Sequence, residues 1–259
     1  MKTLWRYASP AVFAPLAGRW WPIFAVAAIG FAAVGLYLAF LVAPTDAQQG
    51  EVYRLLYLHV PAAWMSMFIY FVMAVYAGLG LVLHTRLSTM MARALAPTGT
   101  LYCVLALLSG AVWGKPTWGT WWVWDARLSS QLMLLCLYLG FLALQDAFDD
   151  RERGERAAGL LAVVGIVNLP IIYFSVVWWN TLHQGASLSP SEGARVAPVM
   201  LAALLTMTLA CWSHAVAAAL VRVRCLIAER DADTVSAVRA ATSPVAVPAA
   251  AAVQKGSHP

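Results

Sequence analysis

Residues 62–83 read AAWMSMFIYFVMAVYAGLGLVL, a run of 22 residues without a charged side chain. A helix needs about 20 largely apolar residues to cross the hydrocarbon core of a bilayer, so this run predicts a transmembrane helix. Five further stretches show the same pattern: 22–42, 98–114, 129–145, 158–178 and 197–221. The sequence therefore predicts an all-α integral membrane protein built as a six-helix transmembrane bundle.

The composition supports this assignment. Of the 259 residues, 62% are hydrophobic and 11% are charged, against about 45–50% and about 25% in soluble domains. The connecting segments 43–61, 84–97, 115–128, 146–157 and 179–196 are too short for a separate soluble domain. We expect an N-terminal tail at 1–21, a membrane domain at 22–222, and a tail at 223–259 that is Ala/Val/Pro-rich and largely disordered.

The distribution of Lys and Arg predicts the orientation in the membrane. Thirteen of these residues lie before residue 22, after residue 221, or in the second and fourth connecting segments, and four lie in the other three segments. Because cytoplasmic segments carry the excess of positive charge, both termini are expected in the cytoplasm. The basic residues are scattered between apolar stretches, so no nucleic-acid site is predicted.

The external segment between the third and fourth helices is rich in tryptophan. Residues 113–128 read WGKPTWGTWWVWDARL, with five tryptophans between 113 and 124. An interfacial aromatic belt is one interpretation, although a belt needs only one or two rings per helix end. If 118–124 form a short helix, Trp118, Trp121 and Trp122 share one face and offer a flat platform to a planar ligand. Asp125 and Arg127 either pair with each other or hold a ligand's polar edge.

Two histidines are expected at the depth of this segment. His59 precedes the second apolar stretch and His183 follows the fifth. Paired imidazoles beside a flat aromatic surface are a standard way to hold haem iron on both faces. His84 and His214, both expected near the cytoplasmic level, form a rival pair that would suit a b-type cytochrome. No aromatic platform accompanies that pair, so we favour the outer one.

Other functions find less support. The four cysteines have no C-x-x-C spacing, and no phosphate-binding, zinc-protease or esterase motif occurs, so no enzyme activity is predicted. A permease that moves haem across the bilayer would need a polar path through the helices. The only polar groups we find for it are His214 and the segment Asn168-Leu169-Pro170, where Pro170 is expected to kink the fifth helix.

Three stretches together resemble the CcmC family, the haem-handling membrane proteins of cytochrome c biogenesis that carry a WWD motif. They are RLLYLHVPAAWMS around His59, WGKPTWGTWWVWDARL, and VNLPIIYFSVVWWNTLHQGAS around His183. The resemblance covers roughly residues 20–222 and leaves out the C-terminal tail. It departs at Ser129 and Gln131, where the family often carries a threonine and an acidic residue. We expect neither position to touch the ligands.

The resemblance implies a haem-presenting factor of the bacterial cytoplasmic (inner) membrane that is not itself an enzyme. Non-covalent haem b would lie on the periplasmic side, with His59 and His183 as axial ligands. The porphyrin would lie against Trp118, Trp121, Trp122, Trp124 and Asp125. The partners would be the periplasmic haem chaperone CcmE and an ABC-type complex of CcmA, CcmB and CcmD, with ATP hydrolysed on CcmA. Among the outer cations Arg54, Lys115 and Arg127, we favour Arg127 for the propionates because a guanidinium matches a carboxylate with two parallel bonds.

Overall fold

The computed structural model describes residues 8–179, 181, 183, 188–189, 193–194 and 197–242, and side chains at 8–179, 181, 183 and 197–236. The chain divides into two compact units, Met1–Ile227 and Ala228–Pro259. The site discussed below and all helices except the C-terminal part of the last one belong to the first unit. The predictions made for residues 1–7, 243–259 and much of 180–196 lie outside the described residues.

Within the described residues, six helical segments are long and apolar enough to cross a bilayer, which confirms the predicted six-helix bundle. The helices are α2 (Pro10–Tyr37), α3 (Leu56–Leu83), α4 (Arg86–Trp118), α5 (Ala126–Asp146), α6 (Arg151–Gly165), α7 (Asn168–Trp178) and α8 (Pro198–Thr242). A π-helical turn, η2 (Leu38–Val42), extends α2, and a 3₁₀ turn, η3 (Glu51–Leu55), leads into α3. Strands β1 (Leu188–Ser189) and β2 (Gly193–Ala194) form a small antiparallel hairpin.

The helices extend beyond the apolar stretches seen in the sequence. The expected loop 84–97 is mostly helical, because α4 begins at Arg86 and only His84 and Thr85 separate it from α3. Likewise α2 begins at Pro10, inside the expected N-terminal tail, and proline is well suited to a first helical turn. Hydropathy marks the part of a helix that meets lipid, so it misses polar turns at either end.

The last helix also runs farther than expected. We expected the tail at 223–259 to be largely disordered, whereas α8 continues to Thr242. The added residues are rich in alanine and include Arg230 and Arg239, which favour helix. The first proline after them is Pro244, and proline cannot continue a helix.

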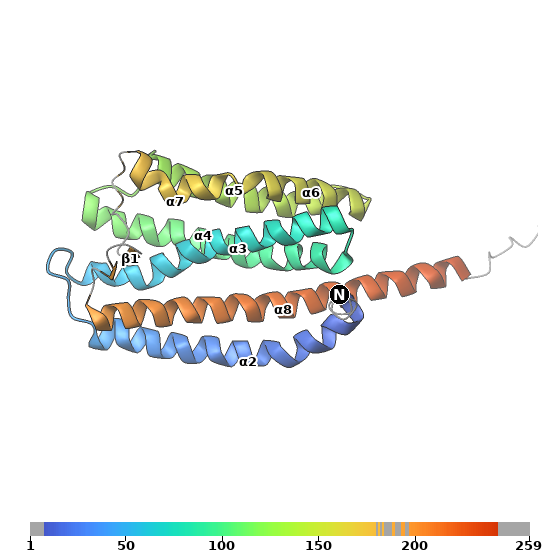
Figure 1. Ribbon diagram of the computed structural model, residues 1–259, viewed down its shortest axis with the longest axis horizontal. Coiled ribbons are helices and arrows are strands. Elements are labelled where there is room, and N and C mark those ends of the chain that lie inside the picture. The colour runs from blue at the N-terminus through green and yellow to red at the C-terminus, as the bar shows by residue number, and fades with distance from the viewer. Residues whose placement is uncertain are drawn as a thin grey trace, which may run out of the picture. The chain divides into compact units, whose positions relative to one another are not determined.

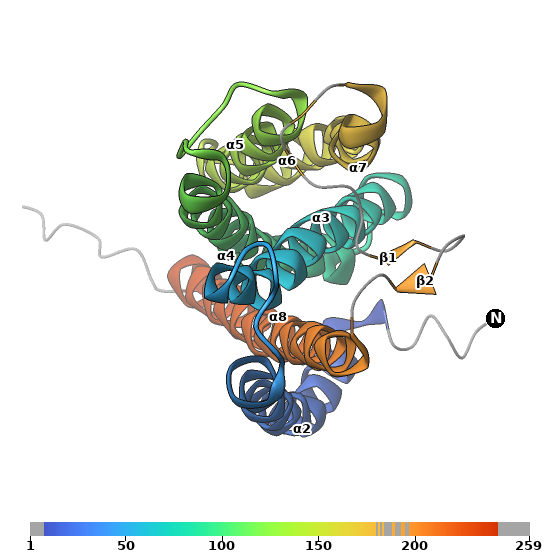
Figure 2. The same cartoon turned by 90° about the vertical axis from the view of Figure 1, so that its left-hand side faces the viewer.

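Helices α3 and α4 run side by side through the middle of the bundle, with α5, α6 and α7 on one side and α8 and α2 on the other (Figures 1 and 2). The central core is made of large buried side chains from four helices. They are Met65, Ile69, Tyr70 and Met73 of α3, Tyr102 and Cys103 of α4, Leu134, Tyr138 and Phe141 of α5, and Ile172 of α7.

Polar side chains inside this core bond to one another. The hydroxyl of Tyr138 donates to the carbonyl of Ser66 at 2.7 Å, and the amide of Gln131 donates to the hydroxyl of Ser66 at 3.0 Å. The same amide lies 3.3 Å from the sulfur of Cys103. Since lipid offers no hydrogen bonds, polar groups in the interior of a membrane bundle need partners within the protein. These contacts join α3, α4 and α5 at one level.

The fifth membrane segment is interrupted near Pro170, as expected. Helix α6 ends at Gly165 and α7 begins at Asn168. Proline lacks an amide proton and its ring crowds the carbonyl four residues earlier, that of Ile166. The side-chain amide of Asn168 donates to the carbonyl of Ser130 at 2.9 Å. This hydrogen bond connects the beginning of α7 to α5.

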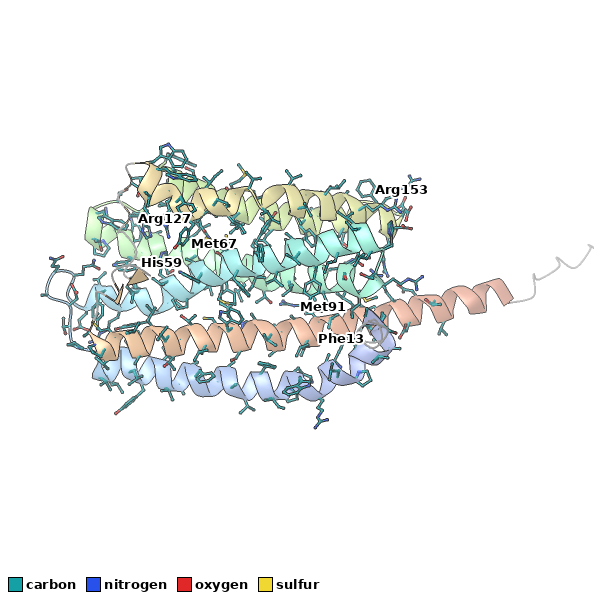
Figure 3. The ribbon with its side chains drawn as sticks, viewed as in Figure 1. Phe13, His59, Met67, Met91, Arg127 and Arg153 are labelled. Atoms are coloured by element: carbon teal, nitrogen blue, oxygen red, sulfur yellow. The ribbon has the colours of Figure 1, made fainter. Side chains whose placement is uncertain are left out.

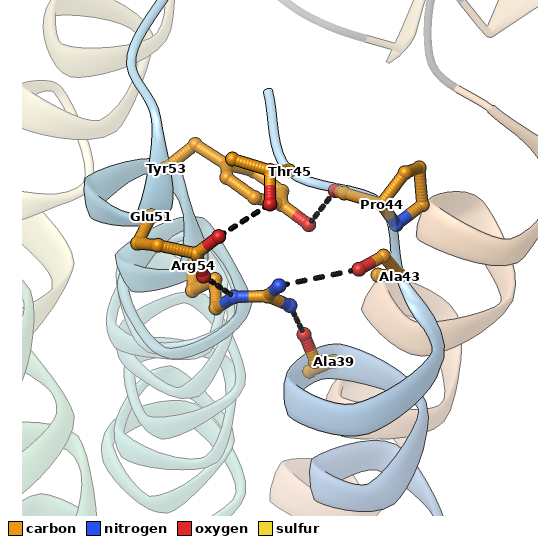
Figure 4. A network of polar contacts seen from close by, with 7 residues as sticks. All are labelled: Ala39, Ala43, Pro44, Thr45, Glu51, Tyr53 and Arg54. Carbon is orange, nitrogen blue, oxygen red and sulfur yellow. Dashed lines mark hydrogen bonds and ion pairs between the residues drawn. The ribbon is translucent and has the colours of Figure 1, made fainter. Parts of the chain in front are cut away.

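A network around Arg54 fixes the entrance to α3 (Figure 4). The guanidinium pairs with Glu51 of the same turn and donates to the carbonyls of Ala39 and Ala43 at the end of the preceding helix. The hydroxyl of Tyr53 donates to the carbonyl of Pro44 at 2.6 Å. The first turn of α3 is therefore held against the end of the first membrane segment.

Candidate ligand-binding cavity at one end of the bundle

A cavity that is partly open to solvent lies at one end of the bundle. Its wall is largely apolar and is contributed by α3, α4, α5, α7, the segment 119–125 and His183. Three of its residues, His59, Met67 and Arg127, lie near one another in Figure 3, far from Arg153 at the opposite end.

The cavity brings together the two histidines predicted from the sequence. The ring centres of His59 and His183 are 6.0 Å apart and their planes are inclined by 34°. An imidazole nitrogen lies about 2.0–2.1 Å from a bound metal such as zinc, so two imidazoles on opposite faces of one metal hold their nitrogens about 4 Å apart. The ring centres lie farther apart than the nitrogens would, so the observed 6.0 Å between ring centres is compatible with one iron between the rings.

Each histidine also contacts a tryptophan. The ring of Trp113 meets that of His59 edge to face, at 5.8 Å and 79°. Trp118 lies 6.0 Å from His183. Trp113 lines the cavity and its indole N–H donates to the side-chain oxygen of Gln49 at 2.8 Å. Trp113 belongs to the tryptophan-rich segment but was not predicted to be part of the site.

The short helix considered at 118–124 does not form. Helix α4 ends at Trp118, and Gly119 caps it with a φ of 80° and an N–H bond to the carbonyl of Lys115 at 3.0 Å. Only glycine adopts this left-handed conformation without strain, so the helix stops there. The β-branched and aromatic residues that follow favour extended backbone.

The aromatic surface forms nevertheless. Trp118, Trp121 and Trp122 all line the cavity. Trp124 does not belong to the lining: its side chain is 77% exposed and packs edge-on against Trp122 at 5.4 Å. Trp121, which is 57% exposed, lies at the rim. The platform therefore comes from the last turn of α4 and the extended segment after it.

Asp125 and Arg127 do not form an ion pair among the interactions of the described residues. Asp125 caps α5, and its Oδ1 accepts the N–H of Leu128 at 2.8 Å. Arg127 donates to the carbonyl of Ile172 at 3.3 Å. This arrangement favours the second of the two alternatives, in which both side chains are directed at a ligand.

Two polar atoms of the cavity wall are buried without a hydrogen-bond partner: Oδ2 of Asp125 and the indole nitrogen of Trp122. A buried polar group that lacks a partner costs about 1–3 kcal/mol. Such groups are uncommon in folded proteins and call for an explanation. A ligand with polar substituents at its edge would satisfy them.

The other two candidate cations are engaged elsewhere. Arg54 holds the network at the start of α3, and the ammonium of Lys115 donates to the carbonyl of Gly119 at 3.1 Å. Neither residue lines the cavity, whereas Arg127 does. Among the described lining residues, Arg127 is the permanent positive charge.

Several lining residues were missed. Gln131 was expected to lie away from the ligands, yet it shares the cavity wall with His59 because α5 turns its buried face toward α3. Met67 and Ile172 lie in apolar runs, where nothing in the sequence distinguishes a cavity wall from an ordinary core position.

The rival histidine pair does not come together in the part of the chain that the structure describes. Nδ1 of His214 lies 2.9 Å from the hydroxyl of Tyr102. His84 ends α3 in a left-handed conformation with a φ of 53°. Neither residue lines the cavity.

Comparisons with known proteins agree with one another. A profile of the family described as "CcmC: Heme exporter protein C" matches residues 3–238. Heme exporter protein C of Escherichia coli strain K12 is 52% identical over 186 residues, which covers 72% of this chain and 76% of that protein. The Haemophilus influenzae protein of the same name is 44% identical over 231 residues, covering 89% and 94%. That of Bradyrhizobium diazoefficiens is 48% identical over 209 residues, covering 80% and 79%.

Proposed function

The chain belongs to the heme exporter protein C family, and on that basis we propose that it is a haem-handling membrane protein of cytochrome c biogenesis. In this proposal the cavity binds haem b without a covalent bond and presents it to an acceptor. Haem is the cargo of the protein, and the chain itself is a haem-presenting factor with no catalytic residue.

One observation carries the proposal: His59 and His183, separated by more than a hundred residues in the chain, face each other in one cavity with 6.0 Å between their ring centres. Two further features fit haem. Trp118, Trp121 and Trp122 supply aromatic surface for a planar macrocycle. Arg127 supplies positive charge for its carboxylates.

The rim of the cavity suits transfer to a soluble acceptor. Bis-histidine ligation would hold haem at any depth in the bilayer, whereas this cavity lies at the end of the bundle and opens beside the exposed Trp121. We infer that one edge of the bound macrocycle stays within reach of the acceptor. The acceptor proposed here is the periplasmic haem chaperone CcmE.

The orientation follows from the charges at the two ends. Arg153 lies at the end opposite His59 and Arg127 (Figure 3), in the basic segment that also contains Arg151 and Arg156. Since Lys and Arg accumulate on the cytoplasmic side, we place the cavity on the periplasmic side of the bacterial inner membrane. We propose CcmA, CcmB and CcmD as membrane partners, with ATP hydrolysis on a partner subunit.

The proposal is tested by the visible absorption spectrum of the detergent-purified protein, oxidised and reduced. We expect a low-spin haem spectrum that disappears in the double variant His59→Ala/His183→Ala. Each single variant should weaken haem binding and impair loading of the chaperone. The matched control is His84→Ala/His214→Ala, which removes two imidazoles outside the cavity and should leave the spectrum unchanged. A spectrum that survives the first double variant and is lost in the second would instead favour a b-type cytochrome.

A further inference from the structure

Besides its proposed contact with iron, the His59 ring has contacts with residues of α4. What we infer from these contacts rests on the proposed function. One turn of α4 lies against the His59 ring. Nδ1 of His59 is 3.1 Å from the hydroxyl oxygen of Ser109. The next residue, Gly110, lies under the ring, and Trp113 meets the ring edge to face.

The hydrogen bonds of Ser109 indicate which atom carries the shared proton. Its hydroxyl donates to the carbonyl of Leu105, one turn earlier in α4, at 2.5 Å. A serine hydroxyl has one proton and two acceptor lone pairs, so toward His59 it accepts. The proton therefore lies on Nδ1, and the other ring nitrogen, Nε2, keeps its lone pair.

Gly110 determines how closely the ring approaches α4. A methyl group at this position would lie 3.0 Å from Cε1 and 3.4 Å from Nδ1 of His59. Carbon contacts are optimal near about 3.5–4.0 Å, so any side chain here would push the ring away. The imidazole thus lies directly on the helix backbone, at a distance that lets Nδ1 reach Ser109.

We propose that Ser109 is a positioning residue for haem ligation: it accepts the Nδ1 proton of His59, fixes the tautomer and the rotation of the ring, and leaves Nε2 as the nitrogen that binds iron. A metal-ligating histidine usually donates its second N–H to such a partner, which orients the ring and raises its basicity. Neither Ser109 nor Gly110 belongs to the tryptophan-rich segment.

The first test measures haem affinity and the electronic state of the iron in Ser109→Ala. Loss of a partner of this kind weakens metal binding by about 10–100-fold. We also expect altered g-values in the electron paramagnetic resonance spectrum of the ferric protein, because the ring is free to rotate. The midpoint potential should rise, since a less basic imidazole stabilises ferric iron less. A tenfold change in the ratio of ferric to ferrous affinity corresponds to about 59 mV.

Two variants separate this role from general packing. Ser109→Thr keeps an acceptor oxygen and should restore the g-values and the potential. Ser130→Ala is the matched control, because Ser130 makes the same bond to the carbonyl of the preceding turn, that of Ala126 at 2.6 Å, whereas it is Ser109 that contacts His59. It should leave all three measurements unchanged. Wild-type values in Ser109→Ala would overturn the inference.

A second measurement needs no substitution at Ser109. In haem-free protein labelled with ¹⁵N in its histidine rings, the ¹⁵N resonances of His59, assigned by their absence in His59→Ala, report the tautomer. We expect protonation at Nδ1; protonation at Nε2 would overturn the inference. Failure of the proposed function looks different: the wild-type protein would bind no haem, or His59→Ala would bind it normally, whatever the tautomer.

Discussion

Replacing Arg127 with alanine tests whether this residue holds the carboxylates of the proposed ligand. Arg127 lines the cavity and makes one hydrogen bond among the described residues, to the carbonyl of Ile172 at 3.3 Å. A guanidinium has five N–H donors, so most of them are available to a ligand. The structure therefore predicts that Arg127 contributes to affinity through the propionates and not through the iron.

The expected magnitude follows from the type of bond. A hydrogen bond to a charged group contributes about 1.5–3 kcal/mol, and about 1.4 kcal/mol corresponds to a tenfold change in dissociation constant. Arg127→Ala should thus bind haem about 10–150-fold more weakly. The low-spin spectrum should persist at saturating haem, because His59 and His183 are unchanged.

The assay combines this variant with a change in the ligand. Haem and its dimethyl ester are titrated into wild-type protein and into Arg127→Ala. In the wild-type protein, esterification of the haem should lower the affinity about as much as Arg127→Ala does. In Arg127→Ala, esterification should lower the affinity little, because the two changes remove the same interaction. Arg127→Lys keeps the charge but loses the paired geometry, and should fall between the two proteins. Equal losses on esterification in wild type and variant would refute the reasoning.

Two further predictions concern the cavity wall and the core. Trp122→Ala removes a ring that lines the cavity, and an aromatic pair contributes about 0.5–1.5 kcal/mol, so haem binding should weaken roughly 2–12-fold in the same titration. Trp124→Ala, at a residue outside the lining, should change the affinity by less than about twofold. A larger effect of Trp124→Ala would mean that the rim contacts the ligand. Tyr138→Phe removes the hydrogen bond to the Ser66 carbonyl and should lower the free energy of unfolding in detergent by about 0.5–1.5 kcal/mol. The control Tyr37→Phe, at an exposed position, should leave that free energy unchanged. Equal unfolding curves for the two variants would show that the buried bond contributes no stability.

The sequence predicts the architecture well because lipid imposes it. A stretch as apolar as 62–83 is most stable inside the bilayer. A helix satisfies the hydrogen bonds of its backbone there. The same reasoning places His59 and His183 at one depth. Depth alone does not bring them together around the bundle, and their 6.0 Å separation depends on how α3 and α7 pack.

Other features of the site depend on information that hydropathy does not carry. Ser109 and Gly110 lie within an apolar helix, and only the rotation of α4 decides whether they face lipid or His59. The spacing of the tryptophans allowed a short helix at 118–124, but Gly119 ends α4 with a left-handed cap and no helix follows it there. A glycine in the middle of an aromatic run was the available signal for that boundary.

The contact between Gln131 and Cys103 bears on which groups the cargo can reach. Haem carries vinyl groups that form thioether bonds with cysteine, which is the basis of haem attachment at C-x-x-C-H sites. Among the described lining residues there is no cysteine: Gln131 forms the wall, and the sulfur of Cys103, buried next to it, is bonded to the Gln131 amide. In the proposed haem complex, the Gln131 amide would therefore keep the Cys103 sulfur behind the cavity wall, away from the vinyl groups.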